Sequence, residues 1–305
     1  MRIIDGRVVP PAKGAVASAL SPTGYLSDYQ ELYRARDEAD FLRDSPRLQG
    51  TTFREAVLAL LDQPLSAFLG FLEDAGIEQV ICAAIDVRSA QGRHLPNEVV
   101  GELVAQCPER IVGLAGVDPR HGMAAVRELE RAVKDLGLRG ANFNPWELRM
   151  YPTDRLFYPL YAKCVELGVC VSLHASVSFG PSRRMDYSHV RYIDEVASDF
   201  PELRMIANHG GWPWVEDLVA LCWRNRNVFI CTSNVRPRYL ADADTGWRPL
   251  LRYGHTVIQD QVIWGSGWPA LPFRRTIEEV EALPLKPSVK QKWLGLNALR
   301  LFDRA

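Results

Sequence analysis

Eight short apolar segments recur along the chain, and stretches with helical periodicity separate them. The segments lie near residues 3, 82, 114, 141, 171, 206, 229 and 263. Strands that read as continuous apolar runs are typical of a parallel sheet, because both faces of such a sheet are covered. Eight βα units in 305 residues predict an α/β protein with one domain over residues 1–305, a closed (β/α)8 TIM barrel. A doubly wound open sheet is the alternative that the same alternation allows.

A long irregular segment, residues 10–64, follows the first apolar run. It begins rich in proline, glycine and serine and carries a charged patch at Glu31–Arg43. A connection of this length inside a compact domain is usually an active-site lid or a binding loop. We therefore expect an insertion in the barrel that covers a site.

The composition argues against several classes of partner. The formal net charge is −1, which disfavours nucleic acid or an anionic membrane surface. No apolar run reaches the roughly 18 residues of a transmembrane helix, and Asp5 comes too early for a signal peptide. The six cysteines lack CxxC spacing, which favours free buried thiols in a reducing cytoplasm. We expect a cytoplasmic protein with a small-molecule partner, no membrane and no nucleic acid.

Two histidines stand at the predicted ends of neighbouring strands. His174 ends one apolar run, and His209 ends the next, directly before Gly210 and Gly211. Chemistry in such barrels takes place at the carboxyl ends of the strands. Tips of adjacent strands lie about 5 to 8 Å apart, so the two imidazoles are expected in one site. A lone histidine would be interpreted as a hydrogen-bonded strand-end residue, but a second at the same height favours a functional pair.

Other side chains reach the same end of the predicted barrel. Arg7 follows the first strand, either as a rim salt bridge or as a fixed cation for a carboxylate or an oxyanion. Asn142 and Asn144 share one face, where they bind substrate oxygens or satisfy polar groups of the core. Ser233 follows the seventh strand and is a further substrate-binding candidate. Trp268 follows the eighth strand and is the candidate wall for an aromatic or apolar substrate.

No cofactor signature accompanies these residues. The sequence has no glycine-rich dinucleotide or phosphate motif after a predicted strand, and no GxSxG motif for a serine nucleophile. A catalytic zinc or manganese ion needs three or four convergent ligands, and only His174 and His209 can be placed there. Arg7 would also repel a divalent cation. The residues alone therefore predict no catalytic metal.

An ordered series of short motifs resembles the amidohydrolase-related barrels, in the branch that includes aminocarboxymuconate semialdehyde decarboxylase. Each motif is weak alone, but together they cover nearly the whole chain. They are Asp74-Ala75-Gly76-Ile77, Asn97, Pro108-Glu109-Arg110-Ile111-Val112-Gly113, Phe157-Tyr158-Pro159-Leu160-Tyr161, Val171-Ser172-Leu173-His174, Phe200-Pro201-Glu202-Leu203, Asn208-His209-Gly210-Gly211, Asn227-Val228, Thr232-Ser233 and Gly265-Ser266-Gly267-Trp268-Pro269.

The resemblance implies a barrel whose metal-binding motifs are degenerate here. The family carries I-D-x-H-x-H on its first strand, and Arg7 and Val9 stand at the two histidine positions. Gly267 stands where the family has the aspartate of G-S-D-x-P. His174 matches a metal-binding histidine, and His209 matches the catalytic histidine. We therefore expect no cofactor, with weak metal binding through His174 left open.

The resemblance also implies an enzyme and a homodimer, with Tyr25–Arg43 as a lid or dimer contact. Our leading expectation is a metal-independent hydrolase of a small carboxylated or cyclic substrate such as a lactone or amide. His209 would act as general acid and base. Arg7 would replace the metal as electrophile or anion anchor, and His174 would orient the proton or share it. A decarboxylase or another carbon–carbon lyase is one alternative, and a non-catalytic binding or scaffold protein is the other.

Overall fold

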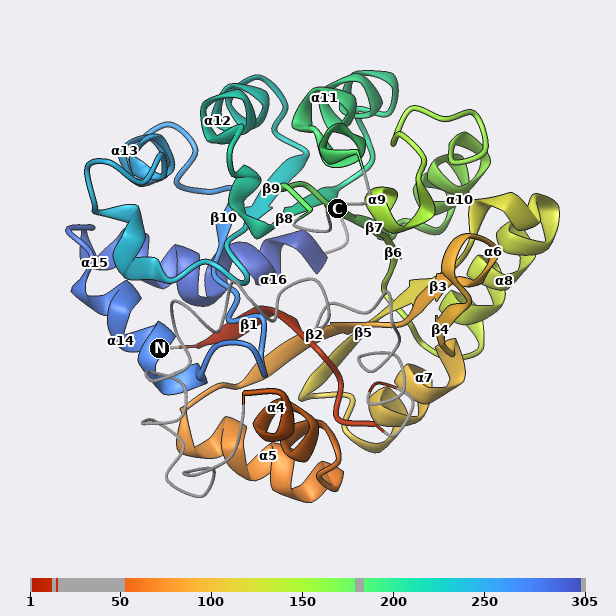
Figure 1. Ribbon diagram of the computed structural model, residues 1–305, viewed down its shortest axis with the longest axis horizontal. Coiled ribbons are helices and arrows are strands. Elements are labelled where there is room, and N and C mark those ends of the chain that lie inside the picture. Colours follow the sequence, from red (N-terminus) through yellow and green to blue (C-terminus); the bar gives the residue numbers. More distant parts are fainter. Residues whose placement is uncertain (1, 13–14, 16–52, 179–183, 303–305) are drawn as a thin grey trace.

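A computed structural model of the chain describes residues 2–12, 15, 53–178 and 184–302. Eight strands form one sheet in which every strand lies beside its neighbour in the chain (Figure 1). They are β1 (Ile4–Val8), β2 (Gln79–Ala83), β5 (Ile111–Gly116), β6 (Gly140–Phe143), β7 (Cys170–His174), β8 (Met205–Asn208), β9 (Val228–Cys231) and β10 (Val262–Ile263). All the paired neighbours are parallel. The order never reverses, so the predicted barrel is confirmed and the doubly wound sheet is excluded.

Strands β1 and β10 meet and bring the sheet round on itself. The N–H of Gly6 donates to the carbonyl of Trp264 at 2.9 Å, and that of Gly267 donates to the carbonyl of Arg7 at 2.9 Å. A Cβ at Gly6 would lie 2.7 Å from a methyl of Ile263, so only glycine permits this approach. The carboxylate of Asp5 spans the same seam. Its Oδ1 accepts from the N–H of Arg7 at 3.0 Å and from that of Ser266 at 3.0 Å.

Helices surround the sheet because each has one apolar face to bury. In α8 (Met123–Lys134), for example, the buried residues Val126, Leu129 and Ala132 follow helical spacing. The other outer helices are α5 (Leu65–Asp74), α7 (Asn97–Gln106), α10 (Tyr158–Leu167), α11 (Val190–Asp199), α12 (Val215–Arg224), α13 (Arg248–Gly254), α14 (Phe273–Ala282) and α15 (Pro287–Gln291). Within the described ranges, no single helix meets the length and hydropathy of a membrane span, although Glu55–Leu61 and Leu65–Asp74, bent by 106°, do so jointly.

The core has two parts, as expected for a barrel. On β2, Ile81 and Ala83 face a cluster inside the barrel, while Val80 and Cys82 join the layer between sheet and helices. The inner cluster also contains Leu301 and other residues of α16 (Asn297–Phe302). This helix covers the end at which the strands begin, which leaves the opposite end for a site. All six cysteines are free thiols.

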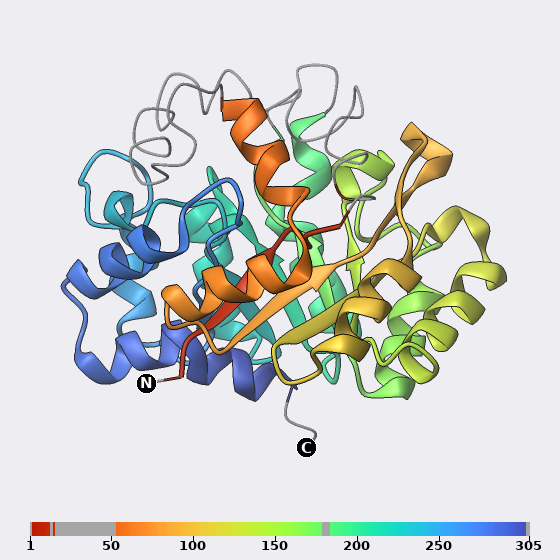
Figure 2. The same ribbon diagram turned by 90° about the horizontal axis from the view of Figure 1, so that it is seen from below.

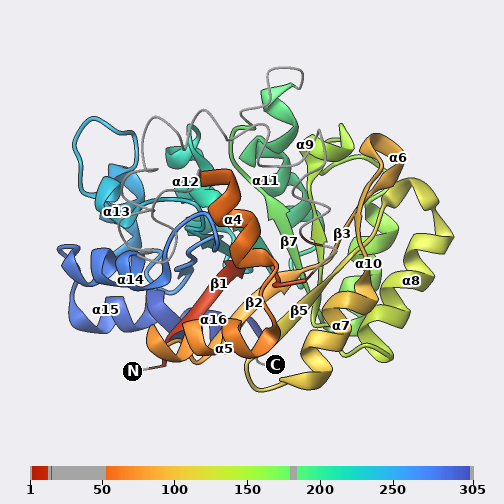
Figure 3. The same cartoon turned by 60° about the horizontal axis from the view of Figure 1, so that its bottom comes forward.

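The hairpin after β2 differs from the predicted pattern, and most of the predicted insertion lies outside the described residues. After β2 the chain forms an antiparallel hairpin of β3 (Ile85–Val87) and β4 (Arg93–Leu95), which the sequence pattern does not predict. From the insertion, the structure describes α4 (Phe53–Leu61), which lies with the hairpin and α9 (Pro145–Leu148) toward one end of the barrel (Figures 2 and 3). The predicted lid or dimer contact at Tyr25–Arg43 lies outside the described residues. That residues 1–305 make one domain therefore stays a prediction.

Candidate active site

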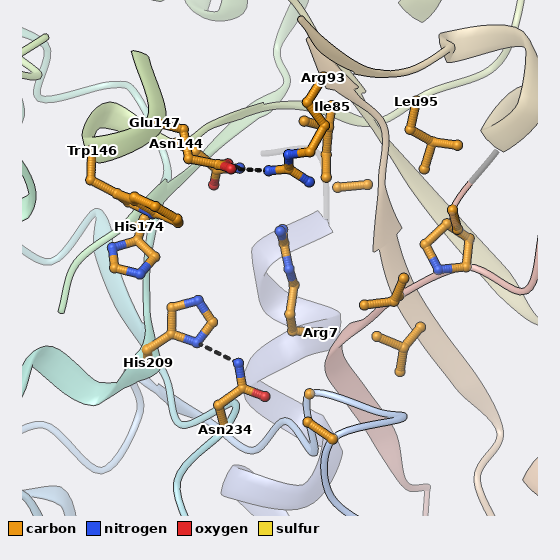
Figure 4. A pocket seen from close by; sticks show the side chains of 17 residues that line it. Arg7, Ile85, Arg93, Leu95, Asn144, Trp146, Glu147, His174, His209 and Asn234 are labelled. Carbon is orange, nitrogen blue, oxygen red and sulfur yellow. Dashed lines mark hydrogen bonds and ion pairs between the residues drawn. The ribbon is translucent and has the colours of Figure 1, made fainter. Parts of the chain in front are cut away.

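A cavity of about 110 Å³ lies at the carboxyl end of the barrel. The three predicted catalytic residues, Arg7, His174 and His209, line it together with the predicted Asn144 (Figure 4). The wall also holds residues that were not predicted, among them Arg93, Trp146, Glu147 and Asn234. The parallel topology thus gathers side chains from distant parts of the chain, for example Arg7 and Asn234, which are 227 positions apart.

His209 directly follows β8 in an unusual backbone conformation. Its φ is +69°, a left-handed value that costs a non-glycine residue energy and that often marks a functional position. The ring nitrogen Nδ1 lies 3.1 Å from the carbonyl oxygen of Ser233 and 3.0 Å from the Ser233 hydroxyl. Burial, and then the positive charge of Arg7, lower the pKa of His209 to about 4. His209 is therefore a neutral imidazole at neutral pH.

His174, at the end of β7, lies against His209. The centres of the two rings are 4.8 Å apart, in agreement with the spacing expected of adjacent strand tips, and Trp146 lies 5.7 Å from His174 on another side. Nδ1 of His174 lies 3.0 Å from the hydroxyl of Ser188, and Nε2 is buried with no hydrogen-bond partner in the described part of the chain. Burial, then His209 and Arg7, hold the pKa of His174 well below its usual range. Both imidazoles are therefore neutral.

Arg7 extends its guanidinium from β1 into the cavity. The terminal nitrogen Nη1 donates to Oδ1 of Asn142 at 2.7 Å, and Asn142 in turn donates to the carbonyl of Ala84 at 3.2 Å. Among the described residues, Arg7 has no ion pair with a carboxylate, so the predicted alternative of a rim salt bridge is wrong there. A half-buried guanidinium held by a neutral amide retains its full charge for an anion.

A buried ion pair that the sequence pattern does not predict lies across the cavity from the histidines. Arg93 of β4 binds Oε1 of Glu147 in α9, and both side chains are almost fully buried. The amide of Asn144 donates to the other oxygen of Glu147 at 2.6 Å. Glu147 thus balances the charge of Arg93. The described lining then has one positive charge without a matching carboxylate, that of Arg7. An acidic residue four positions after a strand, at the end of Asn144-Pro145-Trp146-Glu147, was the available signal.

Three predicted substrate-binding residues lie behind the cavity wall. Asn142 supports Arg7, and Ser233 supports His209, as described above, but neither borders the cavity. Trp268 does not wall the cavity either, which corrects the prediction. It is buried and stacks on Phe273 with ring centres 5.7 Å apart. Its apolar ring is held in the core by that packing, and Trp146 supplies the aromatic wall instead.

Asn234 occupies the space beside Gly267. A Cβ at Gly267 would lie 1.8 Å from Oδ1 of Asn234, so any other residue at 267 would displace this amide. Asn234 itself has a φ of +61°, which asparagine tolerates better than most residues. Its Nδ2 lies 3.5 Å from Nδ1 of His209 (Figure 4). The missing side chain at Gly267 thus makes room for an amide next to the histidine.

The donor set of the cavity does not fit a divalent metal. Within residues 2–12, 15, 53–178 and 184–302, no three His, Cys, Asp or Glu side chains converge as metal ligands would. The unpartnered Nε2 of His174 is one nitrogen donor, and His209 is a second. The guanidinium of Arg7 stands beside both and repels a cation.

Comparison with known proteins gives a consistent family assignment. A family model described as amidohydrolase matches residues 49–304. Curated relatives include a 2-keto-4-carboxy-3-hexenedioate hydratase from Sphingobium sp., 34% identical over 133 residues, which are 38% of this chain and 39% of the hydratase. A 2-amino-3-carboxymuconate-6-semialdehyde decarboxylase from Dictyostelium discoideum is 27% identical over 95 residues (30% and 25%). A 4-sulfomuconolactone hydrolase from Rhizobium radiobacter is 24% identical over 218 residues (68% and 67%). The match thus spans well under half of the first two relatives.

Solved structures agree with the fold and correct one expectation. An uncharacterised TIM-barrel protein from Bordetella bronchiseptica has a TM-score of 0.75 at 26% identity, with 99% of this chain and 98% of that one covered. A 5-carboxyvanillate decarboxylase from Novosphingobium aromaticivorans, solved with manganese, has a TM-score of 0.68 at 15% identity (99% and 96%). A dihydroxybenzoic acid decarboxylase from Polaromonas sp. likewise holds manganese, with a TM-score of 0.67 at 18% identity (99% and 96%). Structural neighbours thus hold manganese in this fold, and this finding contradicts the expectation that the site takes no cofactor.

Proposed function

The chain belongs to the amidohydrolase family, in the branch with the muconate semialdehyde decarboxylases, and on that premise we propose that it is an enzyme that adds water to a small carboxylated substrate. Hydrolysis of a lactone or a similar cyclic ester is the reaction that the site supports best. His209 is the general base in this proposal, and Arg7 holds the carboxylate.

The observation that carries the proposal is the uncompensated charge of Arg7. Among the described residues, its guanidinium lines the cavity with a neutral amide as hydrogen-bond partner, while the second arginine of the wall, Arg93, is paired with Glu147. A carboxylate of the substrate would supply the missing negative charge with a charge-assisted hydrogen bond. The site therefore favours a substrate that presents one anionic group to Arg7.

The state of His209 supports the role of base. We assign the ring proton of His209 to Nδ1, because the carbonyl oxygen of Ser233 at 3.1 Å can only accept a hydrogen bond and the Ser233 hydroxyl at 3.0 Å can accept as well, whereas Nδ2 of Asn234, which can only donate, lies farther away at 3.5 Å. Nε2 then carries the free lone pair, and Figure 4 shows this side of the ring turned away from Asn234. In the proposed reaction Nε2 takes a proton from water as the water oxygen bonds to the lactone carbonyl carbon. The tetrahedral intermediate then breaks the ring C–O bond, and the same proton passes from His209 to the leaving alkoxide.

Hydration of a conjugated double bond is the second candidate, because the hydratase has the highest identity among the curated relatives given above. It needs the same base for water and the same anchor for a carboxylate. Decarboxylation instead requires a proton donor to carbon. With a pKa of about 4, His209 is a neutral imidazole at neutral pH, so it is a poor proton donor to carbon but is available as a base. The site therefore favours chemistry that begins with removal of a proton.

A substrate panel separates these reactions. The purified enzyme is assayed with 4-sulfomuconolactone, 2-keto-4-carboxy-3-hexenedioate and 5-carboxyvanillate, which the relatives' names supply. Ring opening or hydration without release of carbon dioxide is the expected result. Release of carbon dioxide as the main product would replace the proposal with a decarboxylase.

A binding experiment tests the anchor without a known substrate. We expect benzoate to bind, benzamide to bind much more weakly, and Arg7→Met to weaken benzoate binding by roughly 10-fold or more, as for a lost charged hydrogen bond of about 1.5–3 kcal/mol. Arg88→Met is the control, because Arg88 pairs with Asp86 outside this cavity. Equal benzoate affinity for wild type and Arg7→Met would remove Arg7 from the proposal.

The homodimer and the cytoplasmic location stay predictions, and the mass of the purified protein in solution tests the first.

A further inference from the structure

The two imidazoles of the cavity differ in the groups that face Nδ1. Nδ1 of His209 faces the carbonyl oxygen of Ser233 at 3.1 Å, which can only accept, the Ser233 hydroxyl at 3.0 Å, which can accept or donate, and, farther away at 3.5 Å, the amide Nδ2 of Asn234, which can only donate. Nδ1 of His174 faces the hydroxyl of Ser188, at 3.0 Å, which can donate or accept. The direction of this second hydrogen bond therefore decides which nitrogen of His174 carries the proton.

The surroundings of Ser188 fix that direction. The side chain is fully buried, and among the described residues its hydroxyl contacts no acceptor other than Nδ1 of His174. A buried hydroxyl hydrogen without an acceptor costs about 1–3 kcal/mol. If Nδ1 of His174 carried the proton, the Ser188 hydroxyl would accept and its own hydrogen would have no partner. Donation from Ser188 to Nδ1 satisfies both groups and places the ring proton on Nε2.

The surroundings of Nε2 of His174 point to a ligand. This nitrogen is buried, has no hydrogen-bond partner among the described residues, and belongs to a residue that lines the cavity. An unpaired buried N–H is costly, and such groups are retained where a ligand completes them. The acceptor that fits is an oxygen of the bound substrate.

We propose that Ser188 is a positioning residue that holds His174 as the Nε2–H tautomer, so that His174 donates a hydrogen bond to the oxyanion of the reaction. This inference rests on the proposed function and deepens it. His209 takes the proton of water at its free Nε2, while His174, with the opposite tautomer, stabilises the charge that develops on the carbonyl oxygen. The two neutral histidines thus divide the work of base and oxyanion donor.

Both histidines return to their starting protonation states in the proposed reaction. Water loses a proton to His209 and bonds to the carbonyl carbon, the C=O π electrons move to oxygen, and His174 donates to that oxygen without transferring its proton. When the ring C–O bond breaks, the carbonyl re-forms and the proton on His209 goes to the leaving oxygen. His174 ends the cycle in the tautomer in which it began, so Ser188 never has to change its hydrogen bond.

Nitrogen NMR tests the inference on the full-length protein. The six histidines are labelled with ¹⁵N, and the signals of two of them are assigned with His174→Gln and His209→Gln. Protonated and unprotonated ring nitrogens have well-separated shifts. We expect Nε2 of His174 and Nδ1 of His209 to be protonated at pH 7. In Ser188→Ala, the Nδ1 signal of His174 should move away from its hydrogen-bonded position while the His209 signals stay in place.

A control and a competing outcome complete the test. Ser176→Ala removes another buried hydroxyl near the site, which donates to the carbonyl of Trp212, and should leave the His174 signals unchanged. The inference is overturned if Nδ1 of His174 is protonated in the wild type, or if Ser188→Ala leaves that signal in place. It is also overturned if one equivalent of Zn²⁺ removes the Nε2 proton of His174 by coordination. These results leave the Arg7 binding test untouched, so the two proposals fail separately.

Discussion

The carboxyl group of Asp5 makes the stability of the barrel depend on pH in an unusual direction. Oδ1 receives two backbone N–H bonds at the seam of β1 and β10, while Oδ2 is buried with no partner among the described residues. Burial, opposed by the hydrogen bonds from Ser266 and Arg7, raises the pKa of Asp5 from 3.8 to about 7. The folded protein therefore keeps a proton that the unfolded chain releases between pH 4 and 7. The contribution of protonated Asp5 to the free energy of unfolding is therefore fully present below pH 4. It is lost as the pH rises through this window.

The magnitude follows from the shift. A difference of about three pKa units corresponds to roughly 4 kcal/mol, at about 1.4 kcal/mol per unit. The variant Asp5→Asn keeps the accepting Oδ1 and resembles the neutral acid, but it cannot ionise. We expect its stability relative to wild type to rise by up to about 4 kcal/mol between pH 4 and pH 8.

The assay is urea unfolding of wild type and Asp5→Asn at a series of pH values, compared as midpoints and slopes. All other titrating groups are common to both proteins, so the difference isolates Asp5. Asp244→Asn removes an exposed carboxylate and is the control, for which we expect a flat difference. A flat difference for Asp5→Asn as well would refute the reasoning, because it would mean that Asp5 ionises equally in the folded and unfolded chain.

Four further predictions concern the site. Glu147→Gln should lower the free energy of unfolding by about 3–5 kcal/mol, because it leaves Arg93 buried and charged. Arg93→Met combined with Glu147→Leu should cost less than the two single changes together in the same denaturation assay. Gly267→Ala should destabilise more than Gly76→Ala in thermal unfolding: both glycines have a φ near +70°, but only the first would meet a side chain. His209→Asn should keep or raise the melting temperature, since asparagine tolerates a positive φ, while turnover of the panel substrate falls about 10²–10⁴-fold.

The fold was predictable because its signal is local. Each strand is an apolar run, and each helix carries a periodic apolar face, so eight units and their order can be found from the sequence. The positions of His174, His209 and Arg7 followed from the rule that parallel strands deliver their last residues to one end. The ring separation of 4.8 Å agrees with that rule.

The rest of the site depends on packing that no local pattern encodes. Arg93 reaches the cavity from a hairpin of two three-residue strands, which are too short for a periodic signal. It pairs with Glu147, 54 positions away. Trp268 and Trp146 both follow strands, and only the surrounding side chains decide that the first packs on Phe273 and the second borders the cavity. The amide of Asn234 reaches its position beside His209 because Gly267 has no side chain. This arrangement depends on the packing of two loops that are distant in the sequence.

The electrostatic coupling between Arg7 and His209 is central to the proposed site, and ¹⁵N NMR titration of His209 measures it directly. Burial and Arg7 together place its pKa at about 4. We predict that His209 of the wild type titrates near this value, and that its pKa rises toward 6.5 both in Arg7→Met and in wild type saturated with benzoate, because each change cancels the neighbouring positive charge. A His209 that titrates near 6.5 in the free wild type, and that responds to neither change, would contradict the account.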